Sequence, residues 1–397
     1  MLTEVPGGAV SDRVTGPPDL GVDTRKDVYA MNHPDRAYRD EGLDLTDERL
    51  YANVRCNGAE ATDLPAVAYR SKVFSDLEDE KIWTRTWVCA GTADQIPDPG
   101  DLLPFTVGNH GIHLERQLDG TIAGRFNFAQ HGGCRTVPLQ CQTGVKTKCS
   151  YTSCGYSRDR DVIRAADVDD NEAMTYQYLG TRPDRLLPVR SARVGPLVFV
   201  NLDYAGKDLP DGTAYPGPLP EGAAHAGEWC ELDCNWKLAG EALLVALVRA
   251  GFGVAARLFA SVADEPSAAS ELPAAGSAGS VSVDWVFPNL LTVRSDDRAL
   301  FLVTQPTGMS TCLIRPHLLG RGADSPESDQ EWEQVREGMA AVGMQRQREA
   351  ERADADRPCA PGVPDEISPV LQRFRSAVVD KILATHQYYW NAPLYAP

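Results

Sequence analysis

The sequence runs NWKLAGEALLVALVRAGFG from Asn235 to Gly253, and this stretch decides the fold. The apolar character continues to Ala263, which predicts one long helix that the glycines around Phe252 could interrupt, because paired glycines weaken helices. Charges inside the apolar run are costly at the centre of a bilayer, and the run contains Glu241, Arg249 and Arg257. The stretch therefore predicts a buried helix and not a membrane span.

Downstream of this helix the pattern alternates between strand and loop signals. Residues 264–279 are dominated by Ala, Ser, Gly and Pro, which predicts a mobile loop that could cover a pocket. Strands are predicted at Val281–Phe287, Leu290–Ser295, Ala299–Gln305 and Thr311–Leu318. An acidic helix is predicted from Asp329 to about Ala353.

Upstream of the helix the chain has a different pattern. Between Gly100 and Asp203, short apolar runs separated by turn residues predict a small domain of antiparallel hairpins. Residues 205–228 are rich in Pro and Gly and predict an inter-domain linker. A helix is predicted to start at Ser75, and residues 1–63 predict a loosely ordered arm.

Composition limits the classes of partner. A chain of 397 residues with 43% hydrophobic residues can form two domains with separate cores. The formal net charge of −17 argues against nucleic acid and anionic membranes as partners, because both repel an acidic chain. No basic region followed by an apolar core precedes the first domain, so we expect a cytoplasmic protein with a small-molecule partner.

Several stretches, in this order, resemble the Rieske non-haem iron oxygenase α-subunits (the aromatic-ring-hydroxylating dioxygenase type). They are Phe74–Asp101, Gly195–Asn201, Asn235–Ala239 with Glu241, and Pro288-Asn289, and the resemblance extends from about residue 64 to at least 345. It implies an α+β fold with a Rieske-like antiparallel β domain at 64–208. It also implies a helix-grip domain (START/SRPBCC-like) at 209–397, with an antiparallel sheet, a long helix and a substrate cavity.

The first metal centre of this family is a Rieske [2Fe-2S] cluster, which two thiolates and two imidazoles bind as Cys-x-His and Cys-x-x-His. The matching loops here read FAQHGG from residue 128 and CSYT from residue 149. Ala129 replaces a cysteine and Thr152 replaces a histidine, whereas His131 and Cys149 remain. The resemblance therefore implies a vestigial site without the cluster.

A structural zinc site is an alternative use of the nearby cysteines. The candidate ligands are Cys134, Cys141, Cys149 and Cys154, with His131. Their spacings form no Cys-x-x-Cys knuckle, so we favour ordinary core thiols over zinc.

The second metal centre of the family is mononuclear iron, held by two histidines and a carboxylate. The resemblance places the histidines near Val248 and Gly253, the acidic residue that couples the centres near Val245, and the third ligand near Glu337. It therefore implies vestigial iron positions without iron. We expect Val245, Val248, Phe252 and Gly253 to line a hydrophobic pocket instead.

The leading functional hypothesis is a non-redox cyclase or isomerase that acts on a hydrophobic specialised metabolite in natural-product biosynthesis. An apolar cavity can accelerate such reactions by holding reactive atoms together. The alternatives are a non-catalytic binding or partner subunit and an oxygenase with rebuilt metal ligands. The resemblance implies a homotrimer.

Candidate acids and bases near the expected cavity are Glu241, Asp284, His317 and Glu337, and Arg249 could stabilise negative charge. Structural roles compete with each assignment. Glu241 and Arg249 could form an internal pair, Asp284 and Glu337 could be solvated, and a lone strand histidine such as His317 is more often structural. We expect His110 and His113 to lie at the surface.

Overall fold

The computed structural model describes residues 38–56, 61–126, 162, 164–165, 187–270, 279–295, 297–320, 326–358 and 364–384. All of them belong to one unit of the chain, Tyr38–Ala384. Among these residues, no helix is both long and apolar enough to cross a membrane.

The smaller sheet is antiparallel throughout. Its six strands are β3 (Val88–Thr92), β8 (Leu197–Asn201), β7 (Pro188–Val194), β6 (Ile122–Phe126), β5 (His110–Arg116) and β4 (Leu102–Val107), in that spatial order. Residues Asp119 and Gly120 form the tight turn between β5 and β6. The hairpins predicted between Gly100 and Asp203 are therefore confirmed where the structure describes this segment.

Among the described residues the larger sheet has eight strands, and of these only the pair β11–β13 is parallel. In spatial order the strands are β10 (Cys230–Leu232), β16 (Cys312–Gly320), β15 (Arg298–Pro306), β14 (Leu290–Arg294), β13 (Ser280–Val286), β11 (Gly253–Phe259) and β12 (Pro266–Ala269). The short strand β9 (His225–Ala226) also pairs with β16. The four strands predicted between Val281 and Leu318 are confirmed, since β13 to β16 occupy this segment.

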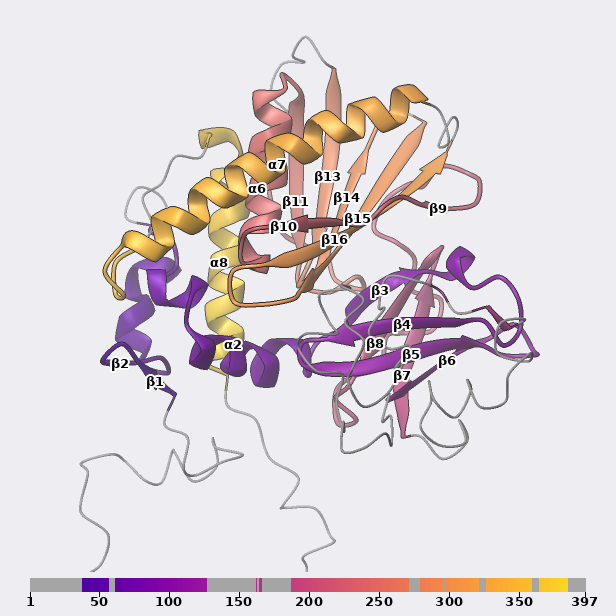
Figure 1. Cartoon of the computed structure of the whole chain (residues 1–397), viewed down its shortest axis with the longest axis horizontal. Coiled ribbons are helices and arrows are strands. Elements are labelled where there is room, and N and C mark those ends of the chain that lie inside the picture. Colours follow the sequence, from indigo (N-terminus) through magenta and orange to yellow (C-terminus); the bar gives the residue numbers. More distant parts are fainter. Residues whose placement is uncertain are drawn as a thin grey trace, which may run out of the picture. The chain divides into compact units, whose positions relative to one another are not determined.

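The longer helices are α6 (Trp236–Arg249), α7 (Pro326–Arg352) and α8 (Ser368–Ile382). Helix α2 (Lys72–Glu78) continues into the π-helical turn η4 (Asp79–Trp83). The short 3-10 helices are η1 (Glu48–Arg55), η3 (Ala66–Tyr69), η5 (Ala93–Gln95) and η8 (Asp365–Ile367). Figure 1 shows α6 and α8 beside the larger sheet, with α7 crossing α6.

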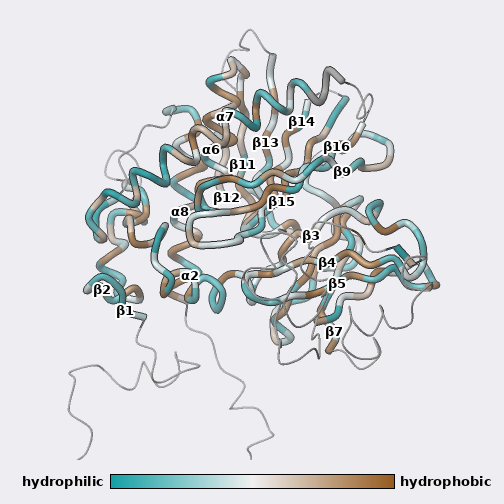
Figure 2. The backbone as a smooth tube through the Cα atoms, viewed as in Figure 1, coloured by the Kyte–Doolittle hydropathy of each residue, from teal (hydrophilic) through white to brown (hydrophobic). Residues whose placement is uncertain are grey.

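Helix α6 packs against the larger sheet through a glycine. The Asn235 side chain caps the helix by accepting a hydrogen bond from the Lys237 amide at 3.1 Å. A Cβ atom at Gly240 would lie 2.3 Å from the Trp285 ring, so only glycine allows this close approach. Trp285 in turn stacks on Phe374 of α8 with a centroid distance of 3.9 Å. Figure 2 shows the mostly hydrophobic colouring of α6.

The long helix expected from Asn235 to Ala263 is wrong in its second half. Helix α6 ends at Arg249, and Gly251 adopts a left-handed backbone with φ of 87° that turns the chain out of the helix. Residues from Gly253 onward form β11, which lies between β13 and the edge strand β12 and pairs with β13 in parallel. Sheet pairing therefore overrides the helical pattern beyond the glycines.

Three other predictions need adjustment. The helix expected at Ser75 begins earlier, because Ser71 caps α2 by accepting from the Phe74 amide at 3.0 Å. Within the arm expected at 1–63, η1 and the short strands β1 (Arg39–Asp40) and β2 (Leu43–Asp44) are formed. The loop expected at 264–279 contains β12, and residues 271–278 lie outside the described residues. The domain boundaries at 63 and 208 remain predictions.

A single buried asparagine links the two sheets. The Asn289 amide accepts a hydrogen bond from the Cys89 backbone N–H at 3.0 Å and donates one to the Cys89 carbonyl at 2.8 Å. It also donates to the Thr304 carbonyl at 3.1 Å. This residue belongs to the Pro288-Asn289 pair noted in the sequence, and its side chain explains why an amide is needed there.

Candidate functional site

The iron positions implied by the resemblance lie at the end of α6. Val245 and Gly253 are buried, and Val248 and Phe252 are half-buried. None of these side chains carries a metal donor. Helix α7 closes over this region, since a Cβ atom at Gly338 would lie 3.0 Å from the Ala246 Cβ atom. Glu337, next to that contact, is exposed.

The residues at these positions therefore do not fit mononuclear iron. Across the described ranges, no group of three or more His, Cys, Asp or Glu side chains is placed to hold a metal ion. The Rieske positions Ala129, His131, Cys149 and Thr152 lie outside these ranges. The same holds for Cys134, Cys141 and Cys154 of the zinc alternative.

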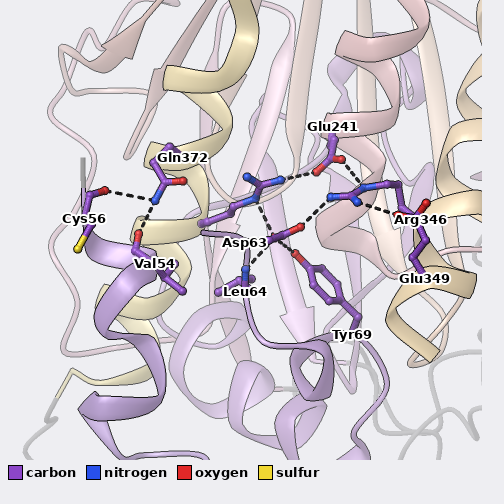
Figure 3. Close-up of polar contacts among 10 residues, drawn as sticks. Val54, Cys56, Asp63, Leu64, Tyr69, Glu241, Arg346, Glu349 and Gln372 are labelled. Carbon is purple, nitrogen blue, oxygen red and sulfur yellow. Dashed lines mark hydrogen bonds and ion pairs between the residues drawn. The ribbon is translucent and has the colours of Figure 1, made fainter. Parts of the chain in front are cut away.

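Glu241 belongs to a buried four-residue cluster, which we call the helix-side cluster: Asp63, Glu241, Arg346 and Arg375. Arg346 donates from Nε to Glu241 Oε1 at 2.7 Å and from Nη2 to Asp63 Oδ2 at 2.8 Å (Figure 3). Arg375 contacts Glu241 Oε2 at 2.8 Å and Asp63 Oδ1 at 2.9 Å. Each carboxylate thus meets both guanidinium groups, and the formal charges cancel.

The helix-side cluster joins elements that are far apart in sequence. Glu241 comes from α6, Arg346 from α7 and Arg375 from α8, whereas Asp63 precedes η3. Burial disfavours the charged form of Arg346, but the Glu241 and Asp63 carboxylates outweigh it and raise its pKa. Glu241 is therefore a structural anchor. It does not pair with Arg249, which is exposed at the end of α6.

Asp284 is fully buried, so the prediction that it could be solvated is wrong. It binds Arg257 at 2.7 Å and Arg294 at 2.7 Å, and we call these three residues the linker-side triad. Burial raises the pKa of Asp284, and both arginines oppose this shift. The arginines also donate to the carbonyls of Pro216 at 3.0 Å and Pro218 at 3.3 Å. The triad therefore fastens the predicted linker.

The strand register places Asp284 and His317 across the sheet from α6. Asp284, Thr292, Phe301 and His317 form one cross-strand row. Side chains alternate between the faces of a strand, so Trp285 points the other way, toward Gly240 of α6. Asp284 and His317 therefore cannot share a cavity with α6.

His317 is 1% exposed, and neither ring nitrogen has a hydrogen-bond partner among the described residues. Burial, with a smaller contribution from Arg315, lowers its pKa to about 3. The imidazole is therefore neutral near pH 7. The neighbours across the sheet, Phe301 and Ala226, offer no polar side chain to the ring, and the structural role of His317 remains a prediction.

The two histidines of β5 differ from the surface positions expected. His113 is fully buried, and burial lowers its pKa to about 3. His110 is half-buried and lies 3.1 Å from Asp79 Oδ2. Burial lowers the pKa of His110, but the bond to Asp79 outweighs this and raises it.

A further buried ion pair, Lys237 with Glu78, was not anticipated from the sequence. Lys237 Nζ lies 2.5 Å from Glu78 Oε1, and Trp236 Nε1 donates to Glu78 Oε2 at 3.0 Å. The ammonium also faces the rings of Tyr69 and Phe74, each with its centroid at 5.3 Å. The available signal was a lysine two residues after the cap residue at the start of an apolar helix, because a lysine there needs a carboxylate partner when it is buried.

Glu78 also lines a cavity of about 130 Å³ between α2 and two hairpin turns. The other lining residues include Ser75, Trp83, Asn109 and Met309. A larger pocket of about 470 Å³ lies beside β2 and η1, where its lining includes Asp44, Arg49 and Asp356. Neither space is lined by the predicted pocket residues Val245, Val248, Phe252 and Gly253.

Comparisons with solved structures identify the class of fold. The chain is similar to a quaternary ammonium Rieske monooxygenase, with a TM-score of 0.55 and 16% identity over 84% of this chain and 98% of that one. It is equally similar to naphthalene 1,2-dioxygenase from Rhodococcus sp., with a TM-score of 0.55 and 16% identity over 87% and 99%. The α+β fold is that of the Rieske oxygenase α-subunits, which confirms the predicted fold class.

Sequence comparisons give the same family. Chlorobenzene dioxygenase subunit alpha of Cupriavidus sp. is 27% identical over 187 residues, which are 44% of this chain and 40% of the relative. Chloroplastic choline monooxygenase of Spinacia oleracea is 26% identical over 188 residues, or 44% and 41%. The chain is a homologue of the Rieske non-haem iron oxygenase α-subunits. It matches about two fifths of the length of these curated relatives, and no family model matches it.

These comparisons contradict one prediction. The sequence led us to expect no Rieske [2Fe-2S] cluster and no mononuclear iron, but the homologues belong to families of Rieske [2Fe-2S] and mononuclear iron oxygenases. We therefore do not retain the prediction of a protein without these groups. Val248 and Gly253, the positions to which the resemblance assigns the iron histidines, carry no metal donor, whereas Glu337 carries a carboxylate.

Proposed function

We propose that this chain is a binding or partner subunit of a Rieske-type oxygenase assembly, in which α6 is a structural support. The observation that carries the proposal is the separation of the predicted catalytic groups. Glu241 is held in the helix-side cluster, Asp284 and His317 lie across the sheet, and two others, Arg249 and Glu337, are exposed. A catalytic acid or base must reach the same substrate as its partners, whereas a supporting subunit needs a stable scaffold.

The names of the relatives support a place in an oligomer. The chlorobenzene and benzene dioxygenase relatives are α-subunits, and the carnitine monooxygenase relative is an oxygenase subunit. This chain would take an equivalent place, in a trimer with or without other α-subunits, and would bind a hydrophobic small molecule. The closed contact between Gly338 and Ala246 supports a rigid scaffold around α6.

The second candidate is the non-redox cyclase or isomerase of a hydrophobic metabolite. One observation favours it: the Glu78 carboxylate borders a cavity, and burial raises its pKa against the opposing effect of Lys237, so it is a candidate proton acceptor. The size of that cavity, about 130 Å³, is well below the ~300–1,000 Å³ of typical ligand sites. The geometry therefore supports this candidate less well than the first.

The test measures turnover by the purified full chain, alone and after co-expression with the catalytic oxygenase α-subunits of its source. Candidate hydrophobic substrates are supplied with and without an electron-donating reductase system. We expect no turnover by the chain alone, and a defined mixed oligomer with increased partner turnover. Iron and acid-labile sulfide are measured on every preparation, so that poor metal loading is recognised.

Two other outcomes would overturn the proposal. Substrate-dependent oxygen consumption by the chain alone would identify an oxygenase with rebuilt ligands. Substrate conversion by the chain without reductant, abolished in Glu78→Gln, would identify the cyclase or isomerase. The matched control is Glu337→Gln, because the carboxylate of Glu337 is exposed on α7.

A further inference from the structure

The small cavity beside Glu78 lies where α2 and η4 meet two hairpin turns, β4–β5 and β15–β16. Its volume is about 130 Å³ and its lining is mostly apolar, with walls that include Trp83, Pro306 and Met309. Lys72 and Met309 are exposed, so the cavity is open to solvent beside these two side chains. The pocket residues predicted at the end of α6 do not line it, so it is separate from the family's iron positions.

The two carboxylates in the lining already have partners in the protein. The Lys237 ammonium lies 2.5 Å from Glu78 Oε1. Asp79 accepts at Oδ1 from the Asn109 amide at 2.9 Å, and its Oδ2 lies 3.1 Å from His110 Nε2. A cation needs a carboxylate that is not compensated, and an ordered water needs about two to four polar partners. The cavity therefore favours an uncharged, apolar guest over a cation or water.

The walls of the cavity are fixed before any ligand binds. A Cβ atom at Gly108 would overlap the Asp79 carboxylate, and the φ of Gly108 is 57°, so a glycine is needed where the β4–β5 turn meets η4. Asn235, the cap of α6, donates from Nδ2 to the Met309 carbonyl at 2.7 Å and holds the β15–β16 turn. The Ser71 side chain caps α2. A site that is already ordered loses little freedom on binding, which favours affinity.

The volume of the cavity selects the size of the guest. Typical ligand sites of roughly 300–1,000 Å³ hold larger molecules, whereas a dry apolar cavity of about 150 Å³ in a protein binds benzene. We propose that the cavity beside Glu78 is a binding site for one uncharged, apolar molecule of the size of a benzene ring. Binding requires no proton transfer at Glu78, and it does not depend on the proposed role as a subunit.

The experiment titrates the purified full chain with three probes by isothermal titration calorimetry. The probes are benzene, the larger bicyclic molecule indole, and the cation tetramethylammonium. We expect benzene to bind at one site per chain, and the other two to give no heat of binding, because one is too large and the other finds no free carboxylate. Benzene should also raise the thermal midpoint, since a ligand that binds the folded chain stabilises it.

Two variants locate the site. Ser75→Leu places a larger side chain in the lining and should weaken benzene binding at least about tenfold, since a single methylene in a hydrophobic pocket has an effect of this size. Met309→Ala removes the side chain at the opening and should allow indole to bind, a gain that a folding defect cannot produce. The matched control is Ser376→Leu, at a half-buried serine of α8 outside the lining, which should leave the Kd for benzene unchanged.

Near-UV circular dichroism checks that each variant is folded. No heat of binding with benzene would overturn the proposal. An equal Kd for benzene in the wild type and in folded Ser75→Leu would place the binding elsewhere on the chain. Tetramethylammonium binding that Ser75→Leu weakens would show a cation site in place of an apolar one.

Discussion

The helix-side cluster and the linker-side triad bury charge in two different ways. In the cluster, Asp63 and Glu241 are matched by Arg346 and Arg375, and further contacts come from Glu349 to Arg346 at 2.8 Å and from the Tyr69 hydroxyl to Asp63 at 2.6 Å. In the triad, Asp284 faces two arginines, and the additional guanidinium donors bind backbone carbonyls of the linker. The first arrangement joins helices to one another, whereas the second fastens a segment without regular structure to the sheet.

His317 extends the comparison, because it lies in the same cross-strand row as Asp284 but has no polar partner among the described residues. A buried carboxylate keeps its charge only beside a cation, whereas an imidazole can remain neutral. Burial therefore produces ion pairs at Asp284 and Glu241, and a neutral ring at His317. Each of these outcomes predicts a different response to mutation or pH.

The largest effect is expected from Arg375→Met in the helix-side cluster. The substitution leaves Asp63 and Glu241 with one guanidinium, and breaking a buried ion pair typically costs about 3–5 kcal/mol in the free energy of unfolding. Urea denaturation measures the change. Arg373→Met on the same helix is the control, since its 3.3 Å contact with Asp380 is partly exposed and should contribute at most about 1 kcal/mol. Equal losses in the two variants would contradict the assigned role.

A smaller loss is expected from Asp284→Asn in the linker-side triad. Arg257 is 34% exposed and can regain water, so we expect a loss of about 2–3 kcal/mol, below that at Arg375. The linker carbonyls at Pro216 and Pro218 should also be held less firmly, which limited proteolysis would detect as faster cleavage at 209–222. Asp208→Asn, at an 89% exposed carboxylate, is the control. An unchanged rate of cleavage would show that Asp284 does not hold the linker in place.

His317 predicts a pH effect of roughly 2 kcal/mol between pH 6.5 and pH 5. Its folded pKa of about 3 lies below the ordinary value of 6.5, so only the unfolded chain gains a proton in this range. Its contribution to stability is present above pH 6.5 and is lost as the pH falls toward 3. Urea midpoints across this range should fall less steeply for His317→Leu than for the wild type. Parallel curves would show that His317 is protonated in the folded protein.

The smallest effect, about 1 kcal/mol, is expected from Gly240→Ala. The new methyl group would overlap the Trp285 ring, and overpacking costs about 1–3 kcal/mol, but alanine regains about 1 kcal/mol of helix propensity. Thermal denaturation measures the net change. Combining Gly240→Ala with Trp285→Leu should cost less than the sum of the two single variants. If the free-energy changes of the two single variants simply add, the contact between Gly240 and Trp285 does not determine how closely α6 packs against the sheet.

The sequence predicted the elements of the larger sheet better than the direction of its side chains. Alternating apolar residues and turn signals are local, so strands β13 to β16 and helix α7 could be located from sequence. Strand β11 could not, because its apolar residues continue the pattern of α6 and its identity depends on pairing with β13. The sequence predicted Glu241 and Asp284 as candidate acids or bases, but it could not show that their arginine partners lie on other elements.

The sequence by itself determined the fold family, the start of α6 at the Asn235 cap and the alternation of the central strands, because these depend on residues that are near one another in the chain. Only the tertiary structure decided what the polar side chains do. Arg346 meets Asp63 across 283 positions of sequence, and the register of β13 places Asp284 on the face away from α6. Such contacts depend on how distant elements pack, and the pattern around either residue alone does not contain that information.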